Sequence, residues 1–338
     1  MAAASVDLSD ALHGALAGRS MMNNGFDFSS DLPVLVIGGA GVDIVGRLKS
    51  ELHPGTSNPA LIRYSFGGVA RNVAENLARL GQPVTLLTAV GEDDAARRML
   101  QRLVEAGVRV EAVLRTRECD TASYLAVLTA TGELQFALDD MRIISLLTPD
   151  YIRQHAHLFE ESSLLFIDAN LPKDTLRTVM SLARRARLPV CADPTSVALA
   201  PRLKPYLSRL FMITPNSSEA GVLCGSNLRV NNRRQALEAA KWLVAQGVQL
   251  AVVTLAEQGL CYATSETSGH IPALRTEVLD PTGAGDALSA AVIFALLNGI
   301  EVDEAMRLGL SAASLTLRYR GAVVPDLSLE KLYDRLVG

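Results

Sequence analysis

From residue 33 onward the chain alternates short, continuous apolar runs with stretches of helical period. Continuous apolar runs are typical of parallel strands buried on both faces, and the amphipathic stretches between them predict helices that cover the sheet. The predicted strands are 33–39, 84–91, 164–169, 189–194, 210–216 and 250–255, and the clearest helices are 69–81 and 93–107. This order predicts an α/β fold with a mostly parallel central sheet flanked by helices.

Two segments break the alternation. Residues 43–66 carry little helix signal, and residues 108–138 have the pattern of consecutive strands with a turn near Thr131 and Gly132. We predict that they form a small β-sheet lid packed over the edge of the central sheet. No low-complexity linker separates them from the rest, so we expect one domain over 32–338. Residues 1–31 are small and polar, and we expect a disordered extension there.

Composition narrows the class of protein. The chain has 32 Lys and Arg against 36 Asp and Glu, and this balance argues against a nucleic-acid partner bound through a basic surface. No apolar run is long enough to cross a membrane. Arg19 is the only Lys or Arg in residues 1–31, so we do not expect a secretory signal. The four cysteines are far apart in the sequence and form no Cys-x-x-Cys pair. We interpret them as free thiols of a reducing compartment and expect a cytoplasmic protein.

Several predicted strands end in a polar residue. Asp168, Asp193, Asn216 and Thr254 each follow an apolar run. Any one of them could simply cap the next helix. Because ligands of open α/β sheets bind beyond the carboxyl ends of the strands, four such residues on one edge predict a binding site.

The stretch "EVLDPTGAGDALSAAVIFALLNG" (277–299) predicts a helix entered through three small residues. Gly283, Ala284 and Gly285 leave the first N–H groups of this helix open to an anion such as a phosphoryl group. Asp286 follows in the first turn, where it could accept a proton from an attacking hydroxyl. The alternative is a tight turn whose aspartate caps the helix. A Walker loop is absent, and the glycines of 37–46 have the wrong spacing for a nicotinamide-binding fingerprint.

Two long motifs carry a family resemblance. "DPTGAGDAL" (280–288) resembles the C-terminal signature of the ribokinase-like (PfkB) carbohydrate and nucleoside kinases, and "FGGVARNVAENLARLG" (66–81) resembles their N-terminal signature. Both stand in the family's order and separation, over roughly residues 33–336. The resemblance implies a ribokinase-like fold for residues 32–338 and an ATP-dependent kinase.

The resemblance also implies roles for residues at the acceptor. Asp286 would be the general base, and Gly283, Ala284 and Gly285 would form the anion hole. Asp43 would bind two neighbouring sugar hydroxyls. Gly67 and Gly68 would let the backbone approach the sugar, with the Asn72 amide directed toward it.

For the nucleotide, "TPNSSEA" (214–220) resembles the motif that organises Mg²⁺ and phosphate through water, with Asn216 and Glu219 as its members. Thr254 and Gly259 match the segment that lines the ATP ribose and phosphates. Ala256 and Gln258 depart from that segment, where the family usually has Gly and Lys. The main chain around Asp280 and Thr282 corresponds to a monovalent-cation (K⁺) site of several relatives.

Within the family, "FGGVARNVAENLARLG", "TASYLAVLTATGELQFALDDM" (121–141) and "VPDLS" (324–328) resemble pseudouridine kinases. This likeness implies phosphorylation of the 5′-hydroxyl of pseudouridine. Asp140 is a candidate acceptor for a base N–H, and Ser123 a candidate helper; the alternative is that Asp140 only ends a strand. By resemblance, paired lids would form a homodimer.

Two other functions remain open at this stage. The first is a ribokinase or another sugar or nucleoside kinase, since all of these substrates present a ribose-like diol. The second is a non-catalytic sugar-binding regulator on the same fold, whose expected mark is a lost base or a broken anion hole. Asp286 and both glycines of the loop are intact.

Overall fold

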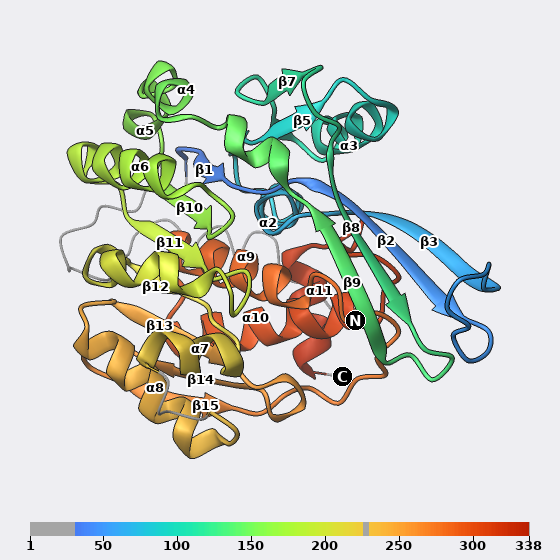
Figure 1. Ribbon diagram of the computed structural model, residues 1–338. Helices are drawn as coiled ribbons and strands as arrows, with labels where there is room; N and C mark the ends of the chain where they lie inside the picture. The colour runs from blue at the N-terminus through green and yellow to red at the C-terminus, as the bar shows by residue number, and fades with distance from the viewer. Residues whose placement is uncertain (1–30, 226–229, 338) are drawn as a thin grey trace, which may run out of the picture.

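The computed structural model describes residues 31–225 and 230–337, so the predicted extension at 1–31 lies almost wholly outside the described residues. A nine-stranded sheet forms the centre of the molecule (Figure 1). Its strands, in spatial order, are β15 (Ser268–Ile271), β14 (Leu260–Ala263), β13 (Leu250–Thr254), β12 (Met212–Ile213), β11 (Val190–Asp193), β10 (Leu164–Asp168), β1 (Val34–Ile37), β4 (Val84–Leu87) and β6 (Val108–Arg109). Neighbours from β13 to β6 are parallel, whereas β14 and β15 add an antiparallel edge. The predicted mostly parallel sheet is confirmed.

Helices cover both faces of this sheet. Along β1 the side chains alternate between two cores, with Val34 and Val36 in one and Leu35 and Ile37 in the other, and all four are fully buried. Burial on both faces explains why the strand is apolar at every position. The helices are α2 (Val69–Arg79), α3 (Asp94–Glu105), α4 (Pro149–Gln154), α5 (His157–Glu160), α6 (Lys173–Ala186), α7 (Ser217–Cys224), α8 (Arg233–Ala245), α9 (Ala284–Leu297), α10 (Val302–Leu317) and α11 (Leu329–Val337).

Helix α9 is the most deeply placed of these. Its residues from Asp286 to Leu297 are all buried, because it packs against both α2 and α10 beneath the sheet. A helix that is apolar on every side can be stable only in such a position. The buried body of α9 anchors its N-terminus, where Ala284 is half-buried and Gly285 is exposed.

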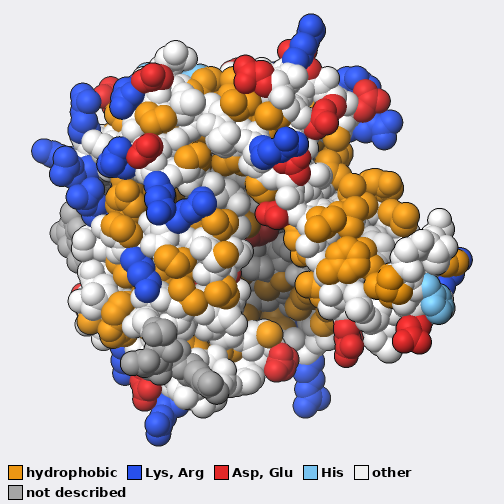
Figure 2. Space-filling model, in the orientation of Figure 1, with side chains coloured by type: hydrophobic (Ala, Val, Ile, Leu, Met, Phe, Trp, Pro, Cys, Tyr) orange, Lys and Arg blue, Asp and Glu red, His pale blue; other side chains and the backbone are white. Residues whose placement is uncertain are grey.

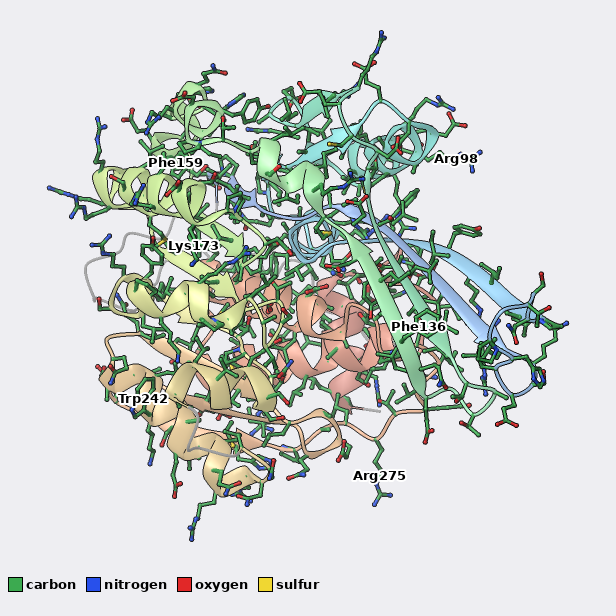
Figure 3. All side chains as sticks on the ribbon, in the orientation of Figure 1. Arg98, Phe136, Phe159, Lys173, Trp242 and Arg275 are labelled. Atoms are coloured by element: carbon green, nitrogen blue, oxygen red, sulfur yellow. The ribbon has the colours of Figure 1, made fainter. Side chains whose placement is uncertain are left out.

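A separate four-stranded sheet projects from the body (Figure 1). Its strands, in spatial order, are β3 (Ala60–Gly67), β2 (Gly41–Leu48), β8 (Ala122–Leu128) and β9 (Leu134–Asp140). Figure 2 shows hydrophobic surface gathered over it, and Figure 3 marks Phe136 on β9, which is 43% exposed.

The predicted bounds of this sheet need one correction. Residues 108–109 form edge strand β6 of the central sheet, and β7 (Leu114–Thr116) pairs with β5 (Ala89–Gly91). Only the part of 108–138 from residue 122 onward enters the small sheet, and that sheet continues to residue 140. The short strands after α3 have too few residues for their partner to be recognised from pattern alone. In the described part of the chain, no helix is long and apolar enough to span a membrane.

Candidate active site

The polar residues at the strand ends do meet on one edge of the sheet. Asp168 and Asp193 are paired neighbours on β10 and β11, and Asn216 bridges to Thr254. Asp168 is fully buried and accepts hydrogen bonds from the backbone N–H groups of Gly39 (2.7 Å) and Ala70 (3.2 Å). It therefore fixes the end of β1 against the start of α2. Beside this edge, Figure 2 shows the molecule hollowed between the body and the small sheet.

The glycine loop stands at the entry to α9. Gly283 is the N-cap residue, with a left-handed φ of 78°, and a side chain there would meet the Ala322 carbonyl oxygen at 2.2 Å. Only glycine fits this position without strain. A side chain on Gly285 would meet nothing within 4 Å, so this residue borders open space. The loop thus offers the free N–H groups of a helix start on its open side.

Asp286 follows in the first turn of α9 and is only 9% exposed. Its Oδ2 accepts a hydrogen bond of 2.6 Å from the Asn72 side-chain amide. Burial raises the pKa of Asp286 to about 6, although the hydrogen bond from Asn72 and the charge of Arg71 act to lower it. The Asn72 Oδ1 is buried and has no hydrogen-bond partner in the described part of the chain. This unpaired acceptor beside a carboxylate fits a substrate hydroxyl.

Asp43 lies on β2, next to the glycine pair that begins α2. A side chain on Gly67 would meet the Asp43 carboxylate at 2.2 Å, so the glycine is what leaves room for it. Burial raises the pKa of Asp43, opposed by the charge of Arg71 and assisted by that of Asp280. Asp280 accepts a hydrogen bond from the Thr282 backbone N–H at 3.0 Å. The structure therefore brings the predicted sugar-binding carboxylate and the 280–286 motif together.

Ser123 and Asp140 lie on the small sheet, away from the face that carries Asp43. They face each other on β8 and β9, and Ser123 is in register with Val42 of β2. Since side chains alternate along a strand, both point to the face of the small sheet opposite to that of Asp43. Asp140 forms an ion pair with Arg142. Hydrogen bonds from Arg142 lower the pKa of Asp140 to about 2. A one-residue shift along β9 is enough to reverse the face.

The residues that share the face of Asp43 are Tyr124 and Asp139, one and two strands away. The next residue on this face, Met141, has its methyl carbon 3.3 Å from where a Gly39 side chain would begin, which places the face toward the candidate site. Sequence reasoning missed both residues. The double aspartate at 139–140 was the available signal, but the strand register was needed to choose between its members.

Asn216 and Glu219 start α7 in a reciprocal capping box. The Asn216 side chain accepts from the Glu219 backbone N–H at 3.0 Å, and the Glu219 carboxylate accepts from the Asn216 N–H at 2.9 Å. Burial raises the pKa of Glu219. Burial also raises the pKa of Asp193 well above its usual value, and the charges of Asp286 and Glu219 add to the effect. Several carboxylates thus crowd one edge, and a nearby cation would relieve their repulsion.

Thr254 and Gly259 flank a short 3₁₀ turn, Ala256–Gln258, between β13 and β14. Gly259 packs so closely that a side chain would meet the Ile271 carbonyl oxygen at 2.0 Å. This close packing requires a glycine at position 259 whether or not a nucleotide binds there. Ala256 has a left-handed φ of 48°. That conformation suits the glycine which the family usually carries there.

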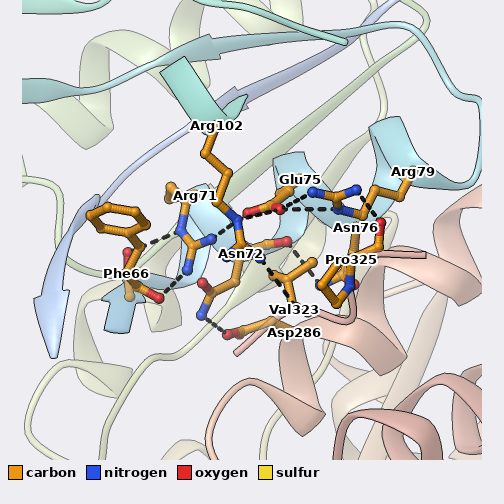
Figure 4. A network of polar contacts seen from close by, with 11 residues as sticks. Phe66, Arg71, Asn72, Glu75, Asn76, Arg79, Arg102, Asp286, Val323 and Pro325 are labelled. Atoms are coloured by element: carbon orange, nitrogen blue, oxygen red, sulfur yellow. Dashed lines mark hydrogen bonds and ion pairs between the residues drawn. The ribbon is translucent and has the colours of Figure 1, made fainter. Parts of the chain in front are cut away.

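A buried ionic cluster supports α2 from below, and the sequence analysis did not anticipate it. Glu75 is fully buried and pairs with Arg71 (2.5 Å), Arg79 (2.7 Å) and Arg102 (2.8 Å), as Figure 4 shows. Burial would raise the pKa of Glu75, but the charges of Arg71 and Arg102 bring it below its usual value. Arg71 also donates to the backbone carbonyls of Phe66 and Gly67. The cluster therefore holds the start of α2, and with it Asn72, in place.

The chain is similar to several known kinases. The profile of the pfkB family carbohydrate kinases matches residues 32–328. The chain is 32% identical to the pseudouridine kinase of Escherichia coli over 88% of its own length and 94% of that protein. It is 30% identical to the guanosine-inosine kinase of Exiguobacterium acetylicum, over 87% and 97% of the two chains.

Solved structures share the fold. A carbohydrate kinase from Agrobacterium tumefaciens is 32% identical, with a TM-score of 0.78 over 90% of this chain and 97% of that one. The ribokinase of Arabidopsis thaliana, solved with ribose and ATP, is 21% identical, with a TM-score of 0.80 over 90% and 98%. This second likeness concerns the fold alone.

Proposed function

Because the chain belongs to the pfkB family of carbohydrate kinases, we propose that it transfers the terminal phosphoryl group of ATP to the 5′-hydroxyl of pseudouridine. Family membership makes it an ATP-dependent phosphotransferase acting on a sugar or nucleoside. The choice of pseudouridine is the proposal. Its products would be pseudouridine 5′-phosphate and ADP.

The observation that carries the proposed chemistry is the Asn72–Asp286 pair beside the open side of the 283–285 loop. In this mechanism Asp286 accepts the proton of the 5′-hydroxyl as its oxygen forms a bond to phosphorus and the bond to ADP breaks. The backbone N–H groups at the start of α9 stabilise the charge on the moving phosphoryl group. Asn72 orients the carboxylate of the general base Asp286, and its own Oδ1 can accept a hydrogen bond from a substrate hydroxyl.

Substrate binding follows from the residues that share one face of the small sheet. Asp43 accepts hydrogen bonds from the 2′ and 3′ hydroxyls, a pattern suited to a carboxylate. Asp139 stands two strands away, about 10 Å by the usual strand spacing, where it can accept an N–H of the base. Pseudouridine has an N1–H that uridine lacks, so such an acceptor would favour it. Closure of the small sheet over the site as a lid would exclude water.

The proposed reaction also involves two cations, Mg²⁺ and K⁺. The carboxylates around Asp193 and Glu219 fit a Mg²⁺ ion that is held mostly through water and accompanies ATP. Asn216 and Glu219 would orient that water. Thr254 and Gly259 would line the nucleotide. The turn formed by Asp280 and Thr282 would hold K⁺, as the resemblance implies.

The experiment is an ADP-release assay over pseudouridine, uridine, guanosine, inosine, adenosine and ribose, with Mg²⁺ and with or without K⁺. We expect the highest kcat/KM for pseudouridine. A clear preference for guanosine or inosine would replace the proposal by the second candidate, which the likeness to the guanosine-inosine kinase favours. A preference for ribose would identify a ribokinase, and nucleoside binding without ADP release would indicate a regulator.

We also propose a homodimer formed through the small sheets. The face opposite to Asp43 carries Ile62, Phe136 and Leu138, which are 60%, 43% and 63% exposed. So much apolar surface on one sheet is typical of an interface. The four cysteines are free, as the reducing cytoplasm would keep them, and we place the reaction there.

A further inference from the structure

A cavity of about 480 Å³ lies at the base of the small sheet. Its walls come from the base of the small sheet, from α3 and from residues 319–323. Val42, Tyr64 and Phe66 line it from the face of the small sheet opposite to that of Asp43, and Ser65, which is in register with Asp43, also borders it. Asp43, Asn72 and Asp286 do not line the cavity, so it is distinct from the proposed site of phosphoryl transfer.

Four arginines line this cavity: Arg71, Arg98, Arg102 and Arg320. Arg71 is committed to the cluster around Glu75, and Arg102 binds Glu75 through its Nε and is one-third exposed. Arg98 and Arg320 have no hydrogen-bond or ion-pair partner among the residues that the structure describes. Figure 3 places Arg98 on α3, above the strands of the small sheet.

The opposing charge around the cavity is small. Asp94 is the one acidic residue that lines it, and this carboxylate is paired with Arg97, which does not line the cavity. Unpaired guanidinium groups at the wall of a cavity are suited to a phosphate, because each can donate two hydrogen bonds to its oxygens.

The remaining walls are aromatic or apolar. Tyr64, Phe66 and Tyr319 line the cavity together with Ala322 and Val323. Flat aromatic rings beside a cationic site favour a ligand that joins a planar ring to a phosphate. The volume is within the range of pockets that hold small organic ligands. Inorganic phosphate alone would leave the aromatic walls unused.

Two contacts connect this cavity to the catalytic centre. Arg71 in its floor donates to the carbonyls of Phe66 and Gly67, immediately before the glycine that caps α2. On the other wall, the Ala322 backbone lies directly behind Gly283, the N-cap residue of the anion hole. A ligand in the cavity would therefore touch segments that position the base and the phosphoryl-binding loop.

We propose that this cavity is a regulatory site for a nucleoside monophosphate, with Arg98, Arg102 and Arg320 on the phosphate and the aromatic side chains on the base. The site rests on the cavity and its arginines. Its regulatory meaning rests on the proposed kinase function.

The binding test is calorimetry of the full chain with UMP, AMP or inorganic phosphate. The active site is first filled with nucleoside and an ATP analogue that cannot transfer its phosphoryl group. We expect one nucleotide per chain in the wild type, and at least tenfold weaker binding in R98A/R320A. The control is Arg115→Ala, which removes an exposed arginine of β7 that lies outside the cavity lining and has no ion-pair partner among the described residues. Thermal melts check that each variant is folded.

A kinetic test distinguishes regulation from competition at the active site. UMP or AMP should change the KM for the nucleoside in the wild type and in Arg115→Ala. This change should be smaller in R98A/R320A, whereas simple competition at the active site would be equal in all three proteins. Absent binding in the wild type, or equal binding by all three proteins, would overturn the site. If inorganic phosphate binds as tightly as UMP or AMP, the proposal that the ligand is a nucleotide is wrong. If UMP and AMP change the kinetics of all three proteins equally, the proposed regulation is wrong. If no substrate is phosphorylated, the calorimetry still decides the site by itself.

Discussion

At the scale of single residues, the environment of Asp286 connects activity with stability. Burial raises the pKa of its carboxyl to about 6, so at pH 7 most molecules carry the charged form. A base with this pKa is stronger than an ordinary aspartate and still available near neutral pH. The same burial means that the folded protein must keep a charge out of water. The buried carboxylate that suits the reaction therefore lowers the stability of the folded protein.

Replacing Asp286 by Asn should reveal both effects. We expect kcat to fall by about 10²–10⁴-fold, because general-base catalysis is lost. We also expect the variant to be more stable than the wild type at pH 8, by on the order of 2 kcal/mol, since a shift of about two pKa units is removed. Turnover assays and urea unfolding would measure the two changes.

The pH dependence supplies the control for this prediction. The folded-state pKa is raised, so the contribution of Asp286 to stability is fully present below its unfolded pKa, near 4, and is lost as the pH rises through about 6. The stability difference between the variant and the wild type should therefore shrink toward zero at pH 4. In the wild type, kcat/KM should fall as the pH drops below 6. A stability difference that does not change with pH would contradict the assigned environment.

At the scale of elements, the short turn between β13 and β14 holds a strained alanine. Ala256 adopts a left-handed φ of 48° and is exposed, so its methyl group contributes strain and little packing. For an L-residue with a side chain this conformation costs about 1–2 kcal/mol, whereas glycine adopts it freely. Alanine at position 256, where the family usually has glycine, thus leaves local strain in the turn.

Ala256→Gly should stabilise the protein by about 0.5–1 kcal/mol, the relief of strain less the extra flexibility of glycine in the unfolded chain. Ala245→Gly is the matched control, because Ala245 is exposed at the end of α8 and glycine should be unfavourable there. Chemical denaturation of both variants measures the change. Equal destabilisation by the two substitutions would show that the turn is not strained.

The two faces of the small sheet provide a second prediction at this scale. Asp139 shares the face of Asp43, whereas Asp140 points to the other face and pairs with Arg142. Asp139→Asn should raise the KM for pseudouridine about 10–100-fold, as expected for loss of a hydrogen bond to a charged acceptor. Asp140→Asn should change it by less than about twofold, since an exposed ion pair contributes little.

Ribose serves as the control substrate, because it has no base for Asp139 to bind. Its kinetic constants should be similar in the wild type and in both variants. The reverse ranking, with Asp140→Asn the more damaging variant, would return the role in base recognition to Asp140.

At the scale of the whole molecule, the sequence predicts whatever depends on local pattern. The strands that end at Asp168 and Asp193 are apolar throughout because helices cover both of their faces, and that pattern is visible in sequence. The loop at 283–285 could be recognised because three small residues precede an apolar helix. The predicted centre of the candidate site rests on these local features.

Features that depend on pairing between distant segments could not be predicted. The faces of β8 and β9 follow from the register of β2 against β8, whose residues are about eighty positions apart in the chain. In the sequence Glu75 is one charge on an amphipathic helix, and only the fold brings Arg102 of α3 against it. Whether a polar side chain is buried is decided by tertiary packing.

The proposed dimer is tested by changing one exposed apolar residue of the small sheet. Leu138→Asp places a charge at the centre of the apolar face, which should prevent burial of that face. Light scattering should report the mass of two chains for the wild type and of one chain for the variant. Val104→Asp is the control: Val104 is 57% exposed on α3, outside the small sheet, and the variant should remain dimeric. A wild type that has the mass of a single chain at micromolar concentration would exclude the interface, and the apolar face would then need another occupant.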